Sequence, residues 1–246
     1  METKHIVMFS GGAASSVVAK IVADKYPNDT ILLHTPSGGE HDDADRFRKQ
    51  VAKYIGLPIT VKKSNKTLWE LVESRKHIPN DSIPYCTSEL KLAPQDRFLK
   101  LFEKKNIDFI QYLGLGIDEW GRMQKVWARN QQKERKVEFP LLDARLTGAD
   151  CQKIIRDEWK ICLPQPYRYL SHNNCIPCYK GGKSHWYKVW KYYPDRFYRA
   201  ARAERRASNT VFYGETLDDL AEQWASEPPQ MELWSDQEGI PCMCAL

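Results

Sequence analysis

Four short apolar segments alternate with segments of helical periodicity in the first half of the chain. The apolar segments have the length of β-strands and are residues 5–9, 30–34, 58–62 and 108–113. The segments with helical spacing are residues 15–25, 43–55, 66–76 and 91–105. A helix between two strands returns the chain to the same end of a sheet, so the strands pair in parallel. The sequence therefore predicts an α/β fold in which helices cover both faces of a parallel sheet.

The pattern changes after Pro140, where helices and loops punctuated by prolines replace the alternation. We expect an α/β domain over residues 1–140 and a mainly helical or irregular C-terminal part over residues 141–246. This second part holds most of the cysteines, a basic and aromatic segment, and a cysteine-bearing tail.

The chain has 246 residues, and none of its apolar stretches approaches the roughly 20 residues that a membrane-spanning helix needs. The opening residues, METKHIV, lack the long apolar segment of a signal peptide. We therefore expect a cytoplasmic protein with no membrane partner. In that reducing compartment the seven cysteines are better interpreted as metal ligands or reactive thiols than as disulfides.

Positive charge is concentrated in residues 179–206. This segment holds nine Lys or Arg against two acidic residues, in a chain whose formal net charge is +5. Aromatic residues alternate with the cations, a combination that neutralises phosphates and stacks bases. We expect Trp186, Trp190 and Phe197 to form the core face of one helix. The charge predicts tRNA or DNA binding, with a role in holding nucleotide phosphates as the alternative.

A glycine-rich junction, Ser10-Gly11-Gly12-Ala13-Ala14-Ser15, lies between the first apolar segment and the first helix. A turn of this kind at a helix N-terminus binds phosphate, because backbone amides point at the anion and glycines let it approach closely. The alternative is a tight turn whose serine caps the helix. The pattern is neither the dinucleotide-binding fingerprint nor the Walker phosphate loop.

Five motifs in the same order resemble the PP-loop superfamily, which includes N-type ATP pyrophosphatases and the phosphoadenosine-phosphosulfate (PAPS) reductase family. The resemblance covers roughly residues 5–206. The motifs are Ser10-Gly11-Gly12-x-x-Ser15, residues 34–41 followed by Arg46-Phe47, Tyr85-Cys86-Thr87 with Lys91 and Pro94, residues 116–119 with Arg122, and residues 173–178.

The resemblance implies an adenine nucleotide site for ATP or PAPS, with magnesium as an optional companion of the phosphates. The phosphate-binding residues would be Ser10, Gly11, Gly12 and Ser15. Thr35 and Glu40 would lie near the nucleotide. The catalytic residues would be Lys91, Glu119 and Arg122, of which the two cations would offset charge that develops on cleavage.

Ala14 departs from the ATP pyrophosphatase pattern, which usually carries an acidic residue at this position. Such an acid helps to hold a magnesium–pyrophosphate complex in that family. The reductase branch tolerates its loss. The departure therefore favours a PAPS-reductase-like origin over a typical ATP pyrophosphatase.

Cys175 and Cys178 have the spacing that lets two thiolates bind one metal centre. In the iron–sulfur reductases of the family, an early cysteine pair and a late CxxC jointly hold a [4Fe–4S] cluster. Cys86 matches the first cysteine of that pair, and Thr87 stands in place of the second. The resemblance thus implies three ligands.

The fourth cluster position would be closed by Cys242 or Cys244, or would remain open on one iron. An open iron is what cluster-dependent thiolation enzymes of the superfamily use to carry sulfur. Zinc bound by four of the cysteines is the alternative. Cys151 and Cys162 are expected to be ordinary buried thiols.

These features predict an adenine-nucleotide-dependent enzyme of sulfur metabolism. One version activates a substrate as an ATP pyrophosphatase does and then transfers sulfur with an iron–sulfur cluster, with a sulfur donor protein as an expected partner. The second version is a sulfonucleotide reductase that releases sulfite from PAPS or its unphosphorylated analogue. An inert nucleotide- or nucleic-acid-binding module is the third interpretation, which Ala14 would permit.

Overall fold

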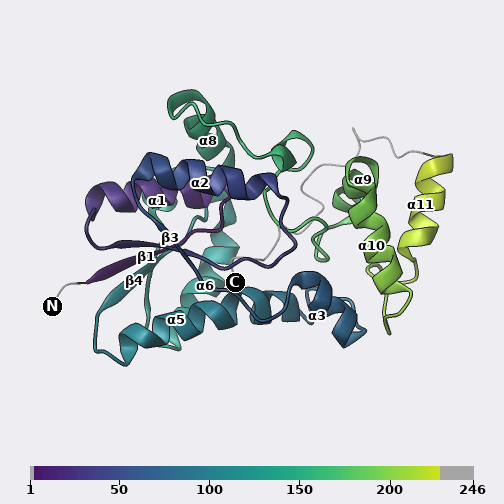
Figure 1. The fold of residues 1–246 in the computed structure, drawn as a ribbon, viewed down its shortest axis with the longest axis horizontal. Helices are drawn as coiled ribbons and strands as arrows, with labels where there is room; N and C mark the ends of the chain where they lie inside the picture. Colours follow the sequence, from purple (N-terminus) through teal and green to yellow (C-terminus); the bar gives the residue numbers. More distant parts are fainter. Residues whose placement is uncertain (1–2, 228–246) are drawn as a thin grey trace.

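The computed structural model describes residues 3–227 of the chain and shows a five-stranded sheet in which all described strands are parallel (Figure 1). Its strand order is β3-β2-β1-β4-β5. The strands are β1 (Lys4–Met8), β2 (Thr30–His34), β3 (Ile59–Val61), β4 (Phe109–Tyr112) and β5 (Lys136–Glu138). The predicted α/β class with a parallel sheet is confirmed.

The α-helices lie between the strands and after them. Those of the sheet region are α1 (Ala13–Lys25), α2 (Asp43–Ile55), α3 (Leu68–Arg75), α4 (Tyr85–Thr87), α5 (Ala93–Glu103), α6 (Trp120–Gln131), α7 (Pro140–Asp143) and α8 (Gly148–Lys153). Those that follow are α9 (Lys183–Tyr192), α10 (Pro194–Glu204) and α11 (Leu217–Ser226). Short 3-10 helices span Ile117–Glu119 and Gln165–Arg168, and π-helical turns span Ser88–Leu92 and Ile154–Glu158.

Both faces of the sheet are covered, as the apolar strands require. Helices α1, α2 and α8 lie on one face, and α5 and α6 lie on the other (Figure 1). Adjacent residues of β1 point to opposite faces of the sheet, because side chains alternate along a strand. Val7 packs with the α1 and α2 side, whereas Ile6 packs with Leu99 of α5.

A second apolar core joins α3 and the segment around α4 to the helices after residue 183. Trp186, Phe197 and Leu217 are fully buried in it, beside Leu71 of α3. The core packing expected for the aromatics is therefore present. The single helix expected there is wrong, because Pro194 starts a new helix, α10, directly after α9.

Three local features differ from the sequence-based expectations. Strand β5 was not predicted, because its short sequence Lys-Val-Glu has one apolar residue and pairs only with β4 at the sheet edge. Helix α3 starts at Leu68 instead of residue 66, because Thr67 and Glu70 form a capping box. Cys162 is exposed, so the expectation of a buried thiol is wrong there, whereas Cys151 is buried.

No helix within residues 3–227 is both long and apolar enough to cross a lipid bilayer. The cytoplasmic location stays a prediction, and so does the domain boundary at residue 140.

Candidate active site

The glycine–serine junction forms the turn between β1 and α1. Gly11 adopts a φ of +83°, a conformation that glycine reaches without strain. Gly12 is the N-cap of α1 and has an extended backbone. The Ser10 and Ser15 hydroxyls lie 3.0 Å apart, and the Ser15 hydroxyl donates to the Gly12 carbonyl. The turn therefore places two hydroxyls beside the N-terminus of α1, where the Ala13 amide donates to the Tyr167 hydroxyl at 3.0 Å. Hydroxyls next to a helix N-terminus are suited to binding phosphate.

This turn borders a cleft at the carboxyl ends of the three central strands. The cleft contains about 720 Å³ of empty space, including the part open to solvent. It lies where the strand order reverses, since β2 follows β1 on one side and β4 joins it on the other. Ligands of open parallel sheets bind at such switch points. Its lining includes Ser10, Ser15, His34, Thr35, Glu40, Lys91, Gln95, Gly114 and Asn173, with apolar Met8, Phe9, Leu33, Leu92 and Leu113.

Glu40 is held in a fixed position within the loop that follows β2. Its carboxylate accepts hydrogen bonds from the Ser37 backbone amide at 2.8 Å and the Ser37 hydroxyl at 2.7 Å. Burial alone would raise the pKa of Glu40, but these hydrogen bonds and the charge of Lys91 outweigh it and lower the pKa. Glu40 is therefore an anion in the cleft that faces a lysine.

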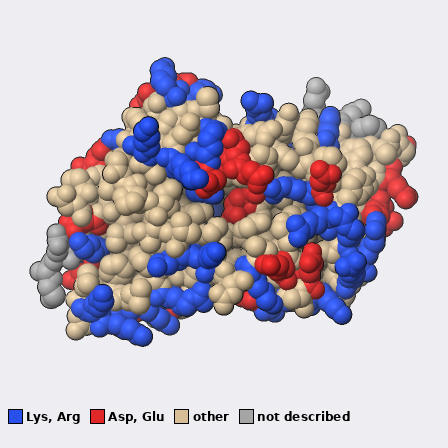
Figure 2. Space-filling model, in the orientation of Figure 1, with Lys and Arg blue, Asp and Glu red and all other residues tan. Residues whose placement is uncertain are grey.

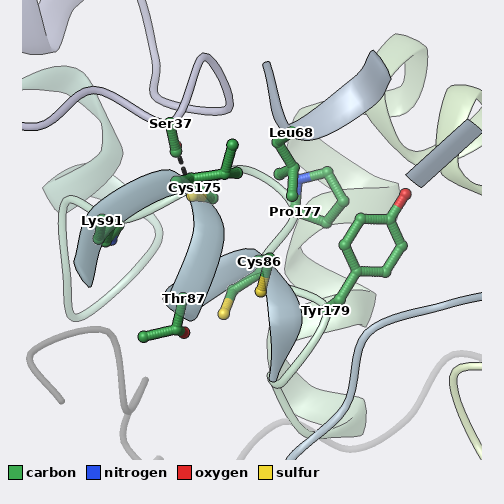
Figure 3. Close-up of a pocket in the computed structure, with 10 residues that line it drawn as sticks. Ser37, Leu68, Cys86, Thr87, Lys91, Cys175, Pro177 and Tyr179 are labelled. Atoms are coloured by element: carbon green, nitrogen blue, oxygen red, sulfur yellow. Dashed lines mark hydrogen bonds between the residues drawn. The ribbon is translucent and has the colours of Figure 1, made fainter. Parts of the chain in front are cut away.

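Three cysteines line a second cavity beside the cleft. Cys86 comes from α4, whereas Cys175 comes from the loop before α9 (Figure 3). Cys178 belongs to the same loop and also lines the cavity. The cavity encloses about 300 Å³ of empty space, including its open part. The Ser37 hydroxyl lies 3.0 Å from the Cys175 sulfur. The fold thus brings the early cysteine to the late pair across a long stretch of sequence.

Two lysines act on these thiols. Burial raises the pKa of Cys86 and Cys178, and it raises the pKa of Cys175 to about 12. The positive charges of Lys91 and Lys180 act in the opposite direction on both Cys86 and Cys178. The buried Lys180 ammonium also donates to the Thr87 hydroxyl at 3.2 Å. The cavity is therefore apolar enough to keep free thiols protonated, yet it has cations that would stabilise thiolates.

Backbone contacts tie the two cavities together. The Ile176 amide donates to the Gly39 carbonyl at 2.8 Å. The Arg196 guanidinium of α10 donates to the carbonyls of Gly39 at 3.0 Å, Glu40 at 3.1 Å and Ile176 at 3.1 Å. The loop that carries Glu40 and the loop that carries the CxxC are thus held as one unit.

Lys91 lines both cavities, which makes it the residue that links the predicted nucleotide site to the predicted cysteine site. It lies in the π-helical turn that precedes α5. Ser10, Ser15, Thr35 and Glu40 share the nucleotide cleft with it, as the predicted grouping requires.

Glu119 and Arg122 lie apart from this group. They form an ion pair with each other, and Glu119 also accepts from the Gly116 amide at 3.1 Å. Neither residue is among those that line the two cavities in the described part of the chain. Burial lowers the pKa of Arg122, against the raising effect of Asp118. Their catalytic role stays a prediction.

Several residues that line the cleft had no role assigned from the sequence, among them His34, Gly114 and Asn173, although His34 and Asn173 lie in the motifs at residues 34–41 and 173–178. His34 ends β2 and Gly114 follows β4, so both lie at strand ends, where a search of glycines and polar residues would have found them. Asn173 donates from its side-chain amide to the Gly11 carbonyl at 2.9 Å and so braces the glycine–serine turn. That contact joins distant segments and has no local signal.

Gly114 permits a close approach of β4 to the turn. A Cβ atom at this position would lie 2.5 Å from the Ser15 backbone nitrogen. We expect Gly114→Ala to lower the free energy of unfolding by about 1–3 kcal/mol, the usual cost of overpacking. Gly121→Ala is the matched control, because a Cβ there meets nothing within 4 Å. Equal melting temperatures for the two variants would contradict this prediction.

The metal centre at these thiols stays a prediction, with zinc as the alternative to an iron–sulfur cluster. No group of three His, Cys, Asp or Glu side chains within residues 3–227 is arranged to hold a single metal ion. A single zinc ion needs all its ligands about 2.0–2.3 Å away, whereas a cluster spreads its thiolate ligands over several irons. Cys86, Cys175 and Cys178 supply the thiols that such clusters use. Cys242 and Cys244 lie outside the described residues.

Several basic side chains of residues 179–206 contact other residues of the fold. Lys and Arg side chains gather over the region of α9 and α10 among acidic ones (Figure 2). Lys183 pairs with Glu215, Arg199 lies over the Trp69 ring, and Arg205 binds Asp218. Lys180 and Arg196 also make contacts within the fold. The tRNA or DNA partner stays a prediction.

Comparison with known proteins supports the nucleotide site. Residues 4–108 match the family described as the phosphoadenosine phosphosulfate reductase domain. Over this part, the chain is similar to the PAPS reductase domain. The resemblance inferred from the motifs is thereby confirmed for this part of the chain.

The PAPS reductase domain covers the glycine–serine turn, the Glu40 loop, Cys86 and Lys91. Cys175 and Cys178 lie beyond it. The uncharacterized protein MJ0973 of Methanocaldococcus jannaschii is 26% identical over 236 residues, covering 91% of this chain and 52% of that protein. The chain thus spans about half the length of this curated relative, and the similarity continues past the PAPS reductase domain.

Proposed function

We propose that the chain is an adenine-nucleotide-dependent enzyme of sulfur metabolism that activates its substrate with ATP and then transfers sulfur at the cysteine cavity. One observation carries the proposal: Lys91 lines both the cleft that follows the glycine–serine turn and the cavity of Cys86, Cys175 and Cys178. A reaction that starts on a nucleotide and ends on sulfur needs two such neighbouring sites.

In the activation step a substrate oxygen would attack the α-phosphorus of ATP, and the bond to the β-phosphate oxygen would break. Pyrophosphate leaves with the electron pair of that bond. The Ser10 and Ser15 hydroxyls and the α1 N-terminus would bind the phosphates. Lys91 would offset the negative charge that develops on the leaving oxygen.

The cysteine cavity would hold a [4Fe–4S] cluster through Cys86, Cys175 and Cys178. The chemistry such a cluster supplies is redox capacity and an iron that binds sulfur when a ligand position is open. Lys91 and Lys180 would stabilise the thiolates, because both cations oppose the effect of burial on the cysteines. A sulfur donor protein is the proposed partner for this half of the reaction. Sulfur at the sulfide level would bond to the activated substrate carbon, and AMP would leave with the electron pair of the carbon–oxygen bond.

Reduction of a sulfonucleotide is the second candidate, favoured by Ala14 and by the family match of residues 4–108. PAPS would then occupy the cleft. Two electrons from a thiol reductant would cleave the sulfur–oxygen bond to the phosphate, which releases sulfite and adenosine 3′,5′-bisphosphate. The same Lys91 would face the leaving group.

Product analysis tests the two reactions. The full chain, purified without oxygen, is incubated with ATP and a small-molecule and RNA extract that supplies the acceptor oxygen in one series, and with PAPS plus a dithiol in another. We expect pyrophosphate from ATP, because the site pairs nucleotide binding with a separate sulfur site. Sulfite from PAPS would establish the reductase instead. If neither product forms although the protein still binds nucleotide, the inert binding module is the remaining interpretation.

A further inference from the structure

Unpaired positive charge collects on helix α5 and on the residues that follow β3. Five Lys or Arg side chains there are exposed and have no ion pair within residues 3–227, namely Lys62, Lys63, Arg97, Lys104 and Lys105. Figure 2 shows Lys and Arg side chains gathered over the region of α5, with few acidic ones among them. These five residues form a surface that we call the basic face.

The acidic residues of α5 are neutralised by other cations. Asp96 accepts hydrogen bonds from Lys133 at 2.8 Å and from Arg135 at 2.7 Å. It also pairs with Lys100 at 3.1 Å. Glu103 accepts from Arg135 at 2.7 Å. Because both carboxylates are already paired, the basic face keeps its attraction for anions.

The basic face begins at the mouth of the nucleotide cleft. The Lys62 amide donates to the His34 carbonyl at 2.9 Å, and His34 lines that cleft. The Lys62 ammonium lies 5.5 Å from the centroid of the Phe98 ring, which belongs to α5. Gln95, which precedes Phe98 by one turn on the same helix, also lines the cleft. The cations therefore extend from the cleft along α5.

The arrangement of these cations suits the phosphates of a duplex. Arg97 and Lys104 are seven residues apart, so they lie on the same side of the helix, about 10 Å from each other along its axis. No aromatic side chain of α5 is exposed, and residues 62–66 contain none. The basic face thus lacks the stacking platforms that bind unpaired bases, which favours contacts to a paired phosphate backbone.

The form of the duplex follows from the helix itself. Helix α5 lies in the outer layer on its side of the sheet (Figure 1). The major groove of B-form DNA is about 12 Å wide and admits an α-helix, whereas the major groove of double-stranded RNA is too narrow for side chains to read. We propose that the basic face binds duplex DNA through its phosphates, so that the DNA passes the mouth of the nucleotide cleft. This binding goes beyond the proposed function and does not depend on the reaction proposed there.

Fluorescence anisotropy of a short labelled DNA duplex tests this surface on the full chain between about 50 and 200 mM salt. We expect the logarithm of the binding constant to fall linearly with the logarithm of the salt concentration, with a slope of about −4 for five phosphate contacts. The double variant Lys62→Ala/Lys63→Ala should reduce the steepness by about 2 and weaken binding about 10- to 100-fold. Arg97→Ala/Lys104→Ala should behave in the same way.

The matched control is Lys191→Ala/Arg206→Ala, which removes two exposed cations from residues 179–206 and should bind DNA as the wild type does. Three results would overturn the proposal: no binding of the duplex at about 50 mM salt, an equal loss of affinity in the control, or tighter binding of an RNA duplex or of a single strand. If a variant does not fold by circular dichroism, the wild-type salt slope and the competition between DNA and RNA decide. Absence of ATP binding would instead refute the proposed function and leave the DNA result as it stands.

Discussion

Replacement of Cys86 by alanine is expected to remove most of the iron from anaerobically purified protein, together with the visible absorption of the cluster. Cys86 shares a cavity with Cys175 and Cys178, although it lies on a different element. A cluster with only two remaining thiolates is labile. Changes to groups that merely orient metal ligands lower affinity by about 10- to 100-fold, and the loss of a ligand should cost at least as much.

Metal content, acid-labile sulfide and the absorption spectrum measure this effect, with circular dichroism as the check on folding. Cys175→Ala should behave as Cys86→Ala does. Cys162→Ala is the matched control, because that cysteine is exposed and is not part of the cavity. Full metal content in Cys86→Ala would refute the site shared by the three cysteines. The metal would then be bound by the CxxC without Cys86.

The tail cysteines have a separate test. A protein with both Cys242 and Cys244 replaced by alanine should keep its cluster if the fourth iron position is open. Loss of the cluster in this variant would show that the tail closes the fourth position, and sulfur transfer at an open iron would then be refuted.

Gly12→Val is expected to weaken nucleotide binding by about 100-fold while the fold is preserved. Gly12 has a φ of −86°, which a β-branched residue can adopt. A Cβ atom there would have its nearest neighbours, the Ser10 and Tyr167 hydroxyl oxygens, at 3.6 Å, an ordinary contact. The added methyl groups would instead occupy the space where phosphate meets the α1 N-terminus.

Calorimetry with ATP and PAPS measures the loss, and the melting temperature should change little. Gly148→Val is the matched control, because Gly148 also begins a helix and a Cβ there meets nothing within 4 Å. Gly11 would be a poor probe, since its positive φ and a 2.4 Å approach to Arg48 would strain any larger residue. Equal affinity of Gly12→Val and wild type would refute the phosphate site.

The grouping of Ser10, Ser15, Thr35 and Glu40 in one cleft was predictable from the sequence. Strand ends in a parallel sheet meet at one edge, so the motifs after β1 and β2 were bound to lie together. The place of Glu119 and Arg122 could not be predicted from their motif, and their catalytic role stays a prediction. Their ion pair lies outside the two cavities of the described residues. In the 3-10 turn at Ile117–Glu119, the Glu119 carboxylate accepts a hydrogen bond from the Gly116 amide.

The cysteine half depended on the family resemblance more than on spacing. Cys175 and Cys178 are near each other in any fold, but nothing local to Cys86 indicates its neighbours. The second apolar core brings them together, since Leu90 and Ile176 pack in the same cluster. A burial pattern along the sequence shows that each segment is apolar without showing which segments meet.

By itself, the sequence determined the parallel α/β sheet, the glycine–serine turn before α1 and the helical C-terminal region, because strand alternation, helical periodicity and glycine conformations are local properties. Only the tertiary structure decided the strand β5, the place of Lys91 between two cavities, and the basic face along α5. These depend on contacts between residues far apart in the chain. The free energy of such contacts comes from packing that no short segment makes alone.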